Sequence, residues 1–219
     1  LKTFLFLFFG SAFAVLGVDV SQATLIPAWK CLKNAGYERA VIRCYQSFGR
    51  PDPNCPHTIY NAMAAGYQTS QIDVYIFPCP RCGNAQGQID AMLNNLAKYK
   101  ANFNRIWLDI EDTGTHSIWG TNYAANRRFA ADLLIGAVNR VGKGRVGIYG
   151  SHYMWGLVFG DASWDLAHSY PVWFAGYDNN PSVTGGWIPF GGWSSPYGHQ
   201  YEGNVNLCGA GVDKNAFLS

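Results

Sequence analysis

Short runs of apolar residues, each ending in a polar or glycine-rich turn, recur along the chain. Six of them are rich in β-branched and aromatic side chains, at residues 16–21, 39–45, 72–77, 105–110, 145–151 and 171–177. Near-continuous apolar runs of this length are typical of strands that are buried on both faces of a sheet. The pattern therefore predicts six buried strands.

Between several of these runs, apolar residues recur at the spacing of a helix. The predicted helices cover residues 58–66, 86–100 and 121–142. The first ends at Gly66 and the third at Gly142, and glycine is the residue that most often follows the last turn of a helix. In the second segment the apolar residues fall on one stripe, as they do in a helix that covers a core.

Strands that alternate with helices predict a parallel α/β sheet. Residues 198–203 and 210–215 have the pattern of two more short strands, and eight strands would close a TIM-type barrel. Residues 178–197 are rich in Gly, Pro, Ser and Trp and show no helical period. We therefore expect an incomplete barrel in which helices are missing near the end.

The first residues have the layout of a secretory signal peptide. Lys2 precedes an apolar run over residues 4–9, and the small-residue pattern Ala12-Phe13-Ala14 follows. An N-terminal anchor is the alternative, but this run is well short of the roughly 20 residues that span a bilayer. We expect residues 1–14 to be a signal peptide and residues 15–219 to form a single barrel domain that is secreted or lysosomal.

Charge and cysteine content narrow the class of protein further. The formal net charge is only +2, so the sequence does not have the strongly basic character of nucleic-acid-binding proteins. Six cysteines in an exported chain indicate disulfides, in a connectivity that the sequence leaves open. Cys79 and Cys82 have the spacing of a redox or zinc motif, yet no second such pair accompanies them. We interpret them as structural.

Carboxylates stand where predicted strands end. In the stretch "RIWLDIEDTG", Asp109 and Glu111 follow an apolar run, and residues two apart on a strand face the same side. Asp19 and Asp213 hold similar places in "GVDVS" and "GVDKN". Barrel enzymes build their active sites at the carboxyl ends of the strands. The four acids are therefore predicted to converge on one pocket.

Crowded carboxylates suit glycoside hydrolysis, because burial and like charges keep a proton on one of them near neutral pH. Asp112, before Thr113-Gly114, is interpreted instead as a helix cap or turn former. The five histidines show no ligand spacing, which argues against a metal site. The chain also lacks the G-x-S-x-G elbow that would indicate a serine hydrolase.

Six motifs together resemble glycoside hydrolase family 25, the lysozymes of the fungal Chalaropsis type. They are "GVDVSQ" (17–22), "LDIE" (108–111), "GIYGS" (147–151), "VWFAGY" (172–177), "HQY" (199–201) and "VDKNAF" (212–217), in the family's order. The resemblance implies an irregular TIM-type barrel of five β/α units followed by three strands. It also implies an N-acetylmuramidase that cleaves the β-1,4 bonds between N-acetylmuramic acid and N-acetylglucosamine.

The resemblance assigns roles to the four acids. Glu111 matches the general acid of the family, and Asp109 matches the aspartate that stabilises the transition state or orients the substrate's N-acetyl group. Asp19 and Asp213 match the aspartates of the first and last strands, which have supporting roles. No metal and no cofactor is implied. The implied partner is bacterial peptidoglycan, with no nucleic acid or membrane, and the enzyme is expected to act as a monomer in defence or digestion.

Sugar sites add aromatic rings that stack on pyranose faces. The residues that match the family's sugar contacts are Tyr75, Tyr149, Tyr177 and Gln200, whereas Trp173 is expected to pack in the core. One departure is Ile76, where many members have a histidine. Two other functions stay open: a chitinase-like glycosidase, whose D-x-x-D-x-D-x-E pattern this chain lacks, and a glycan-binding protein on the same barrel.

Overall fold

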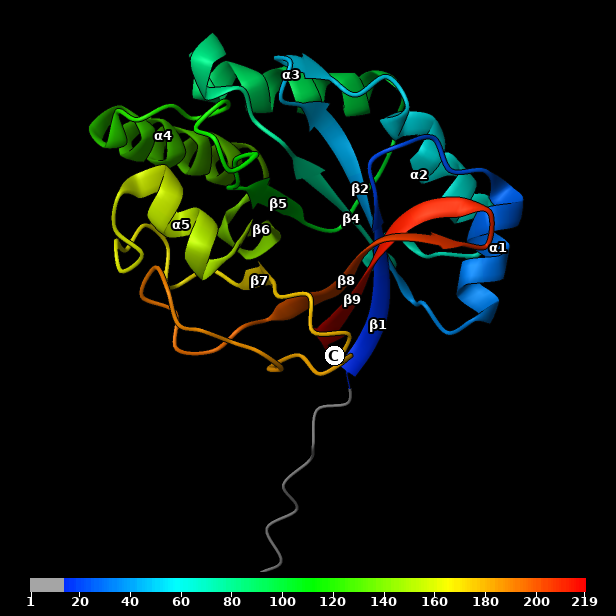
Figure 1. The fold of residues 1–219 in the computed structure, drawn as a ribbon. Coiled ribbons are helices and arrows are strands. Elements are labelled where there is room, and N and C mark those ends of the chain that lie inside the picture. The colour runs from blue at the N-terminus through cyan, green and yellow to red at the C-terminus, as the bar shows by residue number, and fades with distance from the viewer. Residues whose placement is uncertain (1–13) are drawn as a thin grey trace, which may run out of the picture.

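The computed structural model describes residues 14–219, so the expected signal peptide lies, apart from Ala14, outside the described residues. Eight strands close into a barrel (Figure 1), in the order β1-β9-β8-β7-β6-β5-β4-β2 and back to β1. Their bounds are β1 Ala14–Val20, β2 Arg39–Gln46, β4 Ile72–Ile76, β5 Ile106–Asp109, β6 Val146–Gly150, β7 Val172–Ala175, β8 Gly198–Leu207 and β9 Ala210–Leu218. The two-residue strand β3, Arg50–Pro51, pairs with β2 outside the barrel.

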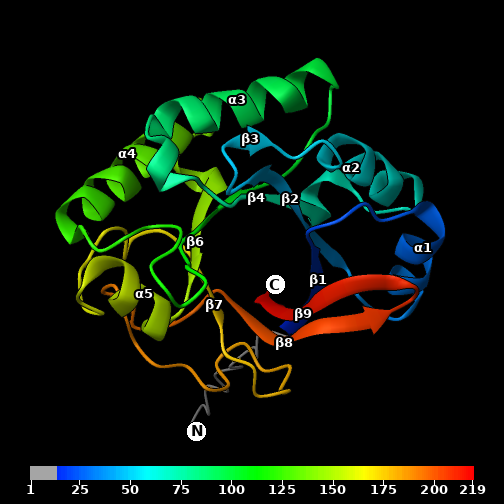
Figure 2. The same ribbon diagram turned by 45° about the horizontal axis from the view of Figure 1, so that its top comes forward.

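One helix follows each of the first five barrel strands in the chain. These helices are α1 Ile26–Asn34, α2 Cys55–Ala64, α3 Ala85–Lys98, α4 Tyr123–Val141 and α5 His152–Phe159. Within the described part of the chain, no α-helix follows β7, β8 or β9. Figure 2 shows the helices arranged around the barrel from α1 to α5, with loops on the remaining side. The expected irregular barrel, with five β/α units followed by three strands, is therefore confirmed.

Two helices were absent from the predicted pattern. The eight residues of α5, HYMWGLVF, are almost entirely apolar, so they show no alternation between a polar and an apolar face. The start of α5 is marked by Ser151, whose hydroxyl accepts a hydrogen bond from the Met154 backbone N–H. The nine-residue α1 has no side-chain cap and starts with a proline in its first turn. Short helices of this kind give little periodic signal.

The expected all-parallel sheet is wrong at its last strand. β9 runs antiparallel to both of its neighbours, β1 and β8. The reversal is made at Cys208-Gly209, where both residues have positive φ, at 57° and 75°, as a tight hairpin turn requires. Asp213 therefore lies within an antiparallel strand, directly opposite Asp19 of β1, and not at the carboxyl end of a parallel strand.

Aromatic rings fill the interior of the barrel. Trp107, Trp173 and Phe217 are buried and contact one another, with ring centroids 5.7 to 6.3 Å apart. Gly147 and Gly198 make room for them, since a Cβ at either position would lie within 2.5 Å of a ring atom. The interior of the barrel is therefore filled by closely packed rings.

All six cysteines form disulfides, in the pairs Cys31–Cys208, Cys44–Cys55 and Cys79–Cys82. The structural interpretation of Cys79 and Cys82 agrees with this pairing. The Cys31–Cys208 bond joins α1 to the turn between β8 and β9, and so attaches the hairpin to the body of the barrel. Among the described residues, none of the helices has both the length and the apolar character needed to cross a membrane.

Candidate active site

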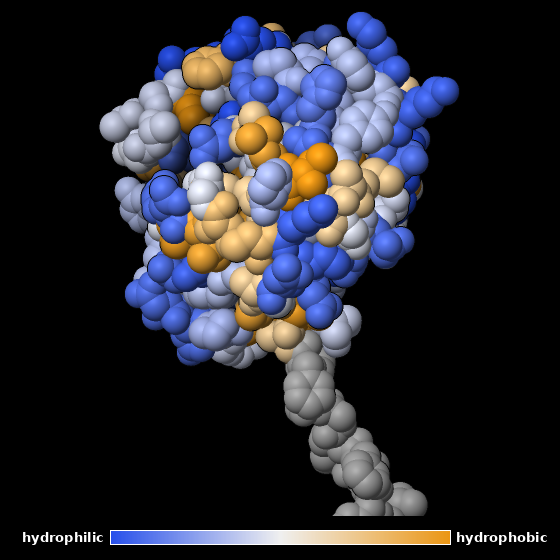
Figure 3. Space-filling model, turned by 90° about the vertical axis from the view of Figure 1, so that its right-hand side faces the viewer, coloured by the Kyte–Doolittle hydropathy of each residue, from blue (hydrophilic) through white to orange (hydrophobic). Residues whose placement is uncertain are grey.

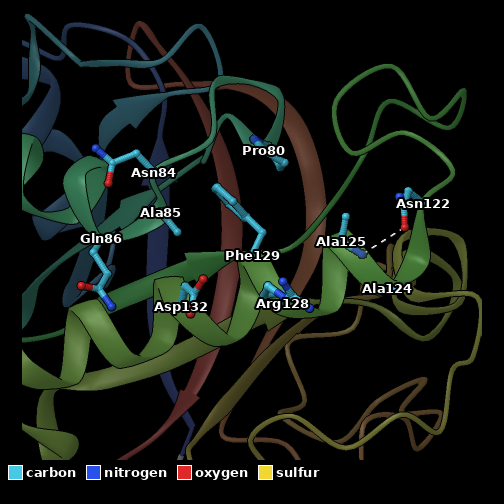
Figure 4. Close-up of a pocket in the computed structure, with 10 residues that line it drawn as sticks. All are labelled: Pro80, Asn84, Ala85, Gln86, Asn122, Ala124, Ala125, Arg128, Phe129 and Asp132. Atoms are coloured by element: carbon cyan, nitrogen blue, oxygen red, sulfur yellow. Dashed lines mark hydrogen bonds between the residues drawn. The ribbon is translucent and has the colours of Figure 1, made fainter.

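The groove between α3 and α4 does not carry a cluster of acids. A groove of about 670 Å³ between α3 and α4 is lined mainly by amide and small side chains, with Arg128, Phe129 and Asp132 on the α4 wall (Figure 4). On the face seen in Figure 3, hydrophobic side chains gather in the middle and hydrophilic ones surround them. The carboxyl groups whose pKa values are raised lie instead together at the mouth of the barrel.

A small pocket of about 80 Å³ brings together every residue predicted for the site. It is lined by Asp19, Tyr75, Asp109, Glu111, Tyr149, Trp173, Tyr177, Gln200 and Asp213, and we call it the acid pocket. Trp173, which was expected only to pack, both packs in the barrel and lines this pocket. The convergence of four acids that the strand ends predicted is therefore confirmed in the geometry.

The backbone that carries Asp109 and Glu111 is held from two sides. Asp109 is the last residue of β5, and the next backbone N–H, that of Ile110, donates to the Tyr149 carbonyl of β6 at 2.9 Å. The indole Nε1 of Trp119 donates to the backbone carbonyl of Glu111, also at 2.9 Å. Trp119 lies in the loop before α4, and nothing in its sequence context indicated this contact.

Asp112 organises that loop. Its carboxylate accepts hydrogen bonds from the backbone N–H groups of Ser117, Ile118 and Trp119, at 3.0, 3.0 and 2.8 Å. Burial would raise the pKa of Asp112, but these donors outweigh it and hold the pKa below its usual value. Asp112 is thus a turn former, as predicted. The turn that it stabilises places the Trp119 indole at hydrogen-bond distance from the Glu111 carbonyl.

Asp19 and Asp213 are neighbours on adjacent strands, and both receive hydrogen bonds from amide groups. Asp19 Oδ2 accepts from Asn215 Nδ2 and from Gln200 Nε2, each at 2.8 Å. Asn215 is fully buried, and its Oδ1 accepts from the Trp173 indole at 2.9 Å. Asn215 was not among the predicted site residues, although it stands two residues after Asp213 and so faces the same side of β9.

Burial and crowding raise the pKa values of the acids. Burial, then the Asp213 carboxylate, raises the pKa of Asp19, and burial, then the Glu111 carboxylate, raises that of Asp109. Burial, followed by the carboxylates of Asp213 and Asp112, raises the pKa of Glu111 to about 7. The positive charge of Arg43 on β2 partly opposes the shift at Asp109. The acid pocket therefore keeps a proton on Glu111 up to neutral pH.

One acceptor in the acid pocket is left without a hydrogen bond in the described part of the chain. Asp109 Oδ1 is buried and accepts no hydrogen bond from any described residue. An unsatisfied buried acceptor is costly, and a donor on a bound ligand would relieve that cost. Among the described residues, the acid pocket included, no group of three or more His, Cys, Asp or Glu is arranged to hold a metal ion.

The predicted aromatic contacts differ in their exposure. Tyr75 and Tyr149 are buried in the wall of the acid pocket, whereas Tyr177 is 63% exposed at its mouth. Tyr177 is thus the ring best placed to stack on a sugar. Ile76 is fully buried in the outer core, apart from the cluster to which Tyr75 belongs. The residue that replaces the family's histidine therefore packs in the core and does not line the acid pocket.

The chain is similar to known lysozymes in sequence and in fold. The family model described as "Lysozyme-like protein 1" matches residues 10–201. "Probable GH family 25 lysozyme 5" of Dictyostelium discoideum is 42% identical over 95% of this chain and 93% of its own, and "Probable GH family 25 lysozyme 2" of the same organism is 41% identical over 92% and 90%. The family GH25 lysozyme structure from Aspergillus fumigatus has a TM-score of 0.76 at 19% identity, over 94% of this chain and 95% of that one, and so shares the fold.

Proposed function

The chain belongs to the glycoside hydrolase family 25 lysozymes, and from this we propose that it cleaves the β-1,4 bonds between N-acetylmuramic acid and N-acetylglucosamine in bacterial peptidoglycan. In this proposal Glu111 is the general acid and base, and Asp109 stabilises the transition state. The observation that carries it is the acid pocket itself, where burial and neighbouring carboxylates raise the pKa of Glu111 to about 7.

The reaction begins with proton transfer from the Glu111 carboxyl group to the bridging oxygen. The bond between that oxygen and the anomeric carbon breaks, and its electron pair leaves with the oxygen. Positive charge then develops on the anomeric carbon and the ring oxygen, where ionised Asp109, supported by Asp19 and Asp213, stabilises it. In the second half, the Glu111 carboxylate takes a proton from the water whose oxygen bonds to the anomeric carbon.

Two features of the acid pocket suit an N-acetylated sugar. The unpartnered Oδ1 of Asp109 would accept a hydrogen bond from the acetamido N–H of the substrate. The exposed ring of Tyr177 offers an apolar face to a pyranose ring. We further propose that the enzyme is exported and works outside the cell or in lysosomes, since its three disulfides would form in the oxidising lumen of the secretory pathway.

The activity is expected to fall as the pH rises through about 7. The raised pKa means that Glu111 holds its proton below about 7 and loses it above, and only the protonated form can donate to the leaving oxygen. The measurement is the rate of muropeptide release between pH 4 and pH 9 at constant ionic strength. A rate that stays constant well above pH 7 would contradict the assignment of Glu111.

The experiment that tests the function is mass spectrometry of the soluble fragments that the protein releases from purified peptidoglycan. Fragments with N-acetylmuramic acid at the reducing end are the expected result. A chitin oligomer serves as the control substrate. Cleavage of chitin alone would establish the chitinase-like alternative, and no cleavage of either polymer would indicate a glycan-binding protein on this barrel.

A further inference from the structure

Gln200 lies at the centre of the acid pocket and is itself buried, with 3% of its surface exposed. It belongs to β8, between β7 and β9 in the barrel. Its Nε2 lies 2.8 Å from Asp19 Oδ2 and 3.3 Å from Asp213 Oδ2. Its Oε1 lies 2.7 Å from the hydroxyl of Tyr149 and 3.0 Å from that of Tyr177. One amide group therefore joins two acids and two tyrosines.

The four partners fix the orientation of the amide group. Ionised carboxylates only accept hydrogen bonds, so the NH₂ group faces Asp19 and Asp213. The carbonyl oxygen then accepts from both tyrosine hydroxyls. An amide has two N–H donors and one oxygen with two lone pairs, so all of its hydrogen-bonding capacity is used within the protein. None is left for a sugar, which was the role that the sequence suggested for Gln200.

We propose that Gln200 is a positioning residue, which holds the Asp19 and Asp213 carboxylates side by side and fixes the hydroxyls of Tyr149 and Tyr177, without contacting the substrate. The Asp19–Asp213 pair needs such a group, because like charges on directly opposed residues of neighbouring strands repel each other. An N–H shared with each carboxylate offsets part of that repulsion. The kinetic part of this inference rests on the proposed function.

His199, the residue before Gln200, holds the loop that carries Tyr177. His199 is fully buried, and its ring nitrogens contact the backbone carbonyls of Ser182 and Gly176 at 2.6 and 2.7 Å. Both carbonyls belong to the loop that carries Tyr177. The hydroxyl of Tyr177 hydrogen-bonds to Gln200, and the backbone of its loop contacts the His199 ring. Consecutive residues of β8 thus place Tyr177 at the mouth of the acid pocket.

Loss of the amide group has a defined electrostatic consequence. Hydrogen bonds to an ionised carboxylate favour the ionised form, and the Gln200 N–H lowers the pKa of Asp19 against the effect of burial. The other titratable and charged groups around this pocket stay in place, namely Glu111, Asp109, Asp213, Tyr75, Tyr149, Tyr177 and Arg43. Without the donor, the Asp19 carboxylate ionises only at higher pH.

The test compares Gln200→Met with Gln88→Met. Methionine keeps the length of the side chain but makes none of the four hydrogen bonds. Gln88 is a matched control, because it is also a buried glutamine whose amide group makes three hydrogen bonds, but its partners are backbone groups of Cys79 and Gly83. Both variants lose buried hydrogen bonds, so a general loss of stability will affect both.

For Gln200→Met we expect kcat on a soluble muropeptide oligomer to fall by about 10²-fold, because the acids lose their positions, with KM nearly unchanged. The acidic limb of the pH profile should move to higher pH. Gln88→Met should keep the kcat, the KM and the pH profile of the unsubstituted chain. A rise in KM with unchanged kcat in Gln200→Met would mean that Gln200 acts in sugar binding and not in positioning the acids, and would overturn the proposal.

A second measurement does not depend on the substrate. Carbon-13 NMR of the aspartate carboxyl groups should show Asp19 titrating at higher pH in Gln200→Met than in the unsubstituted chain and in Gln88→Met. An unchanged Asp19 titration would overturn the proposal even if activity fell. If the unsubstituted chain cleaved no muropeptide, the proposed function would fail, while the NMR result would still decide whether Gln200 holds the acids.

Discussion

Glu111→Gln is expected to lose nearly all hydrolysis, by about 10² to 10⁴-fold in kcat, while the protein stays folded. The amide has the shape of the carboxyl group but cannot give a proton to the bridging oxygen. The fold should tolerate the change, because Trp119 holds the backbone carbonyl of Glu111 and not its side chain. The substitution also removes a buried group that folding makes harder to ionise.

The measurement is the rate of muropeptide release by purified Glu111→Gln, with binding to insoluble peptidoglycan measured in parallel. Glu38→Gln is the matched control, because Glu38 is an exposed glutamate outside the acid pocket. We expect the control to cleave normally and Glu111→Gln to bind without cleaving. Normal lysis by Glu111→Gln would show that another group donates the proton.

Asp109→Asn is the second substitution with a large expected effect, a loss of about 10² to 10³-fold in kcat. The neutral amide cannot stabilise the positive charge that develops on the sugar. Asp109 is buried and its Oδ1 accepts no hydrogen bond from residues 14–219, so the change removes a charge without breaking a hydrogen bond to that atom. The variant should therefore fold.

The control for Asp109 is Asp132→Asn, since Asp132 lies on α4 in the groove of Figure 4, away from the acid pocket. Steady-state kinetics on a soluble muropeptide oligomer separate the two parts of the proposed role. A fall in kcat reports the lost charge, and a rise in KM reports a lost contact to the acetamido group. If neither constant changed, Asp109 would have no part in the reaction.

Much of the barrel could be predicted from sequence because buried strands have a strong local signal. All six apolar runs became strands, and residues 198–203 and 210–215 lie within β8 and β9. The direction of β9 could not be predicted, since periodicity carries no information on whether a strand is parallel to its neighbours. That direction depends on the tight turn at Cys208-Gly209.

The acids themselves could be predicted because their positions are a local property of the chain. Asp109 and Glu111 follow a buried strand two residues apart, so they had to share a side at the end of that strand. The type of residue was also informative, because burying a carboxylate is costly unless it is paired or hydrogen-bonded, so acids directly after a buried strand indicate a specific role. The sequence alone thus determined the barrel class and the group of residues that carries the chemistry.

The tertiary structure decided which of these groups touch. Gln200 donates to Asp19 across 181 positions of the chain, and Asn215 does so across 196. Such pairs meet only because β1 and β9 close the barrel, a long-range event that no local pattern records. The raised pKa of Glu111 has the same origin, because Glu111 is buried and lies near the Asp213 carboxylate only once the barrel has closed. The sequence determined which residues form the acid pocket, and barrel closure determined their contacts and their pKa values.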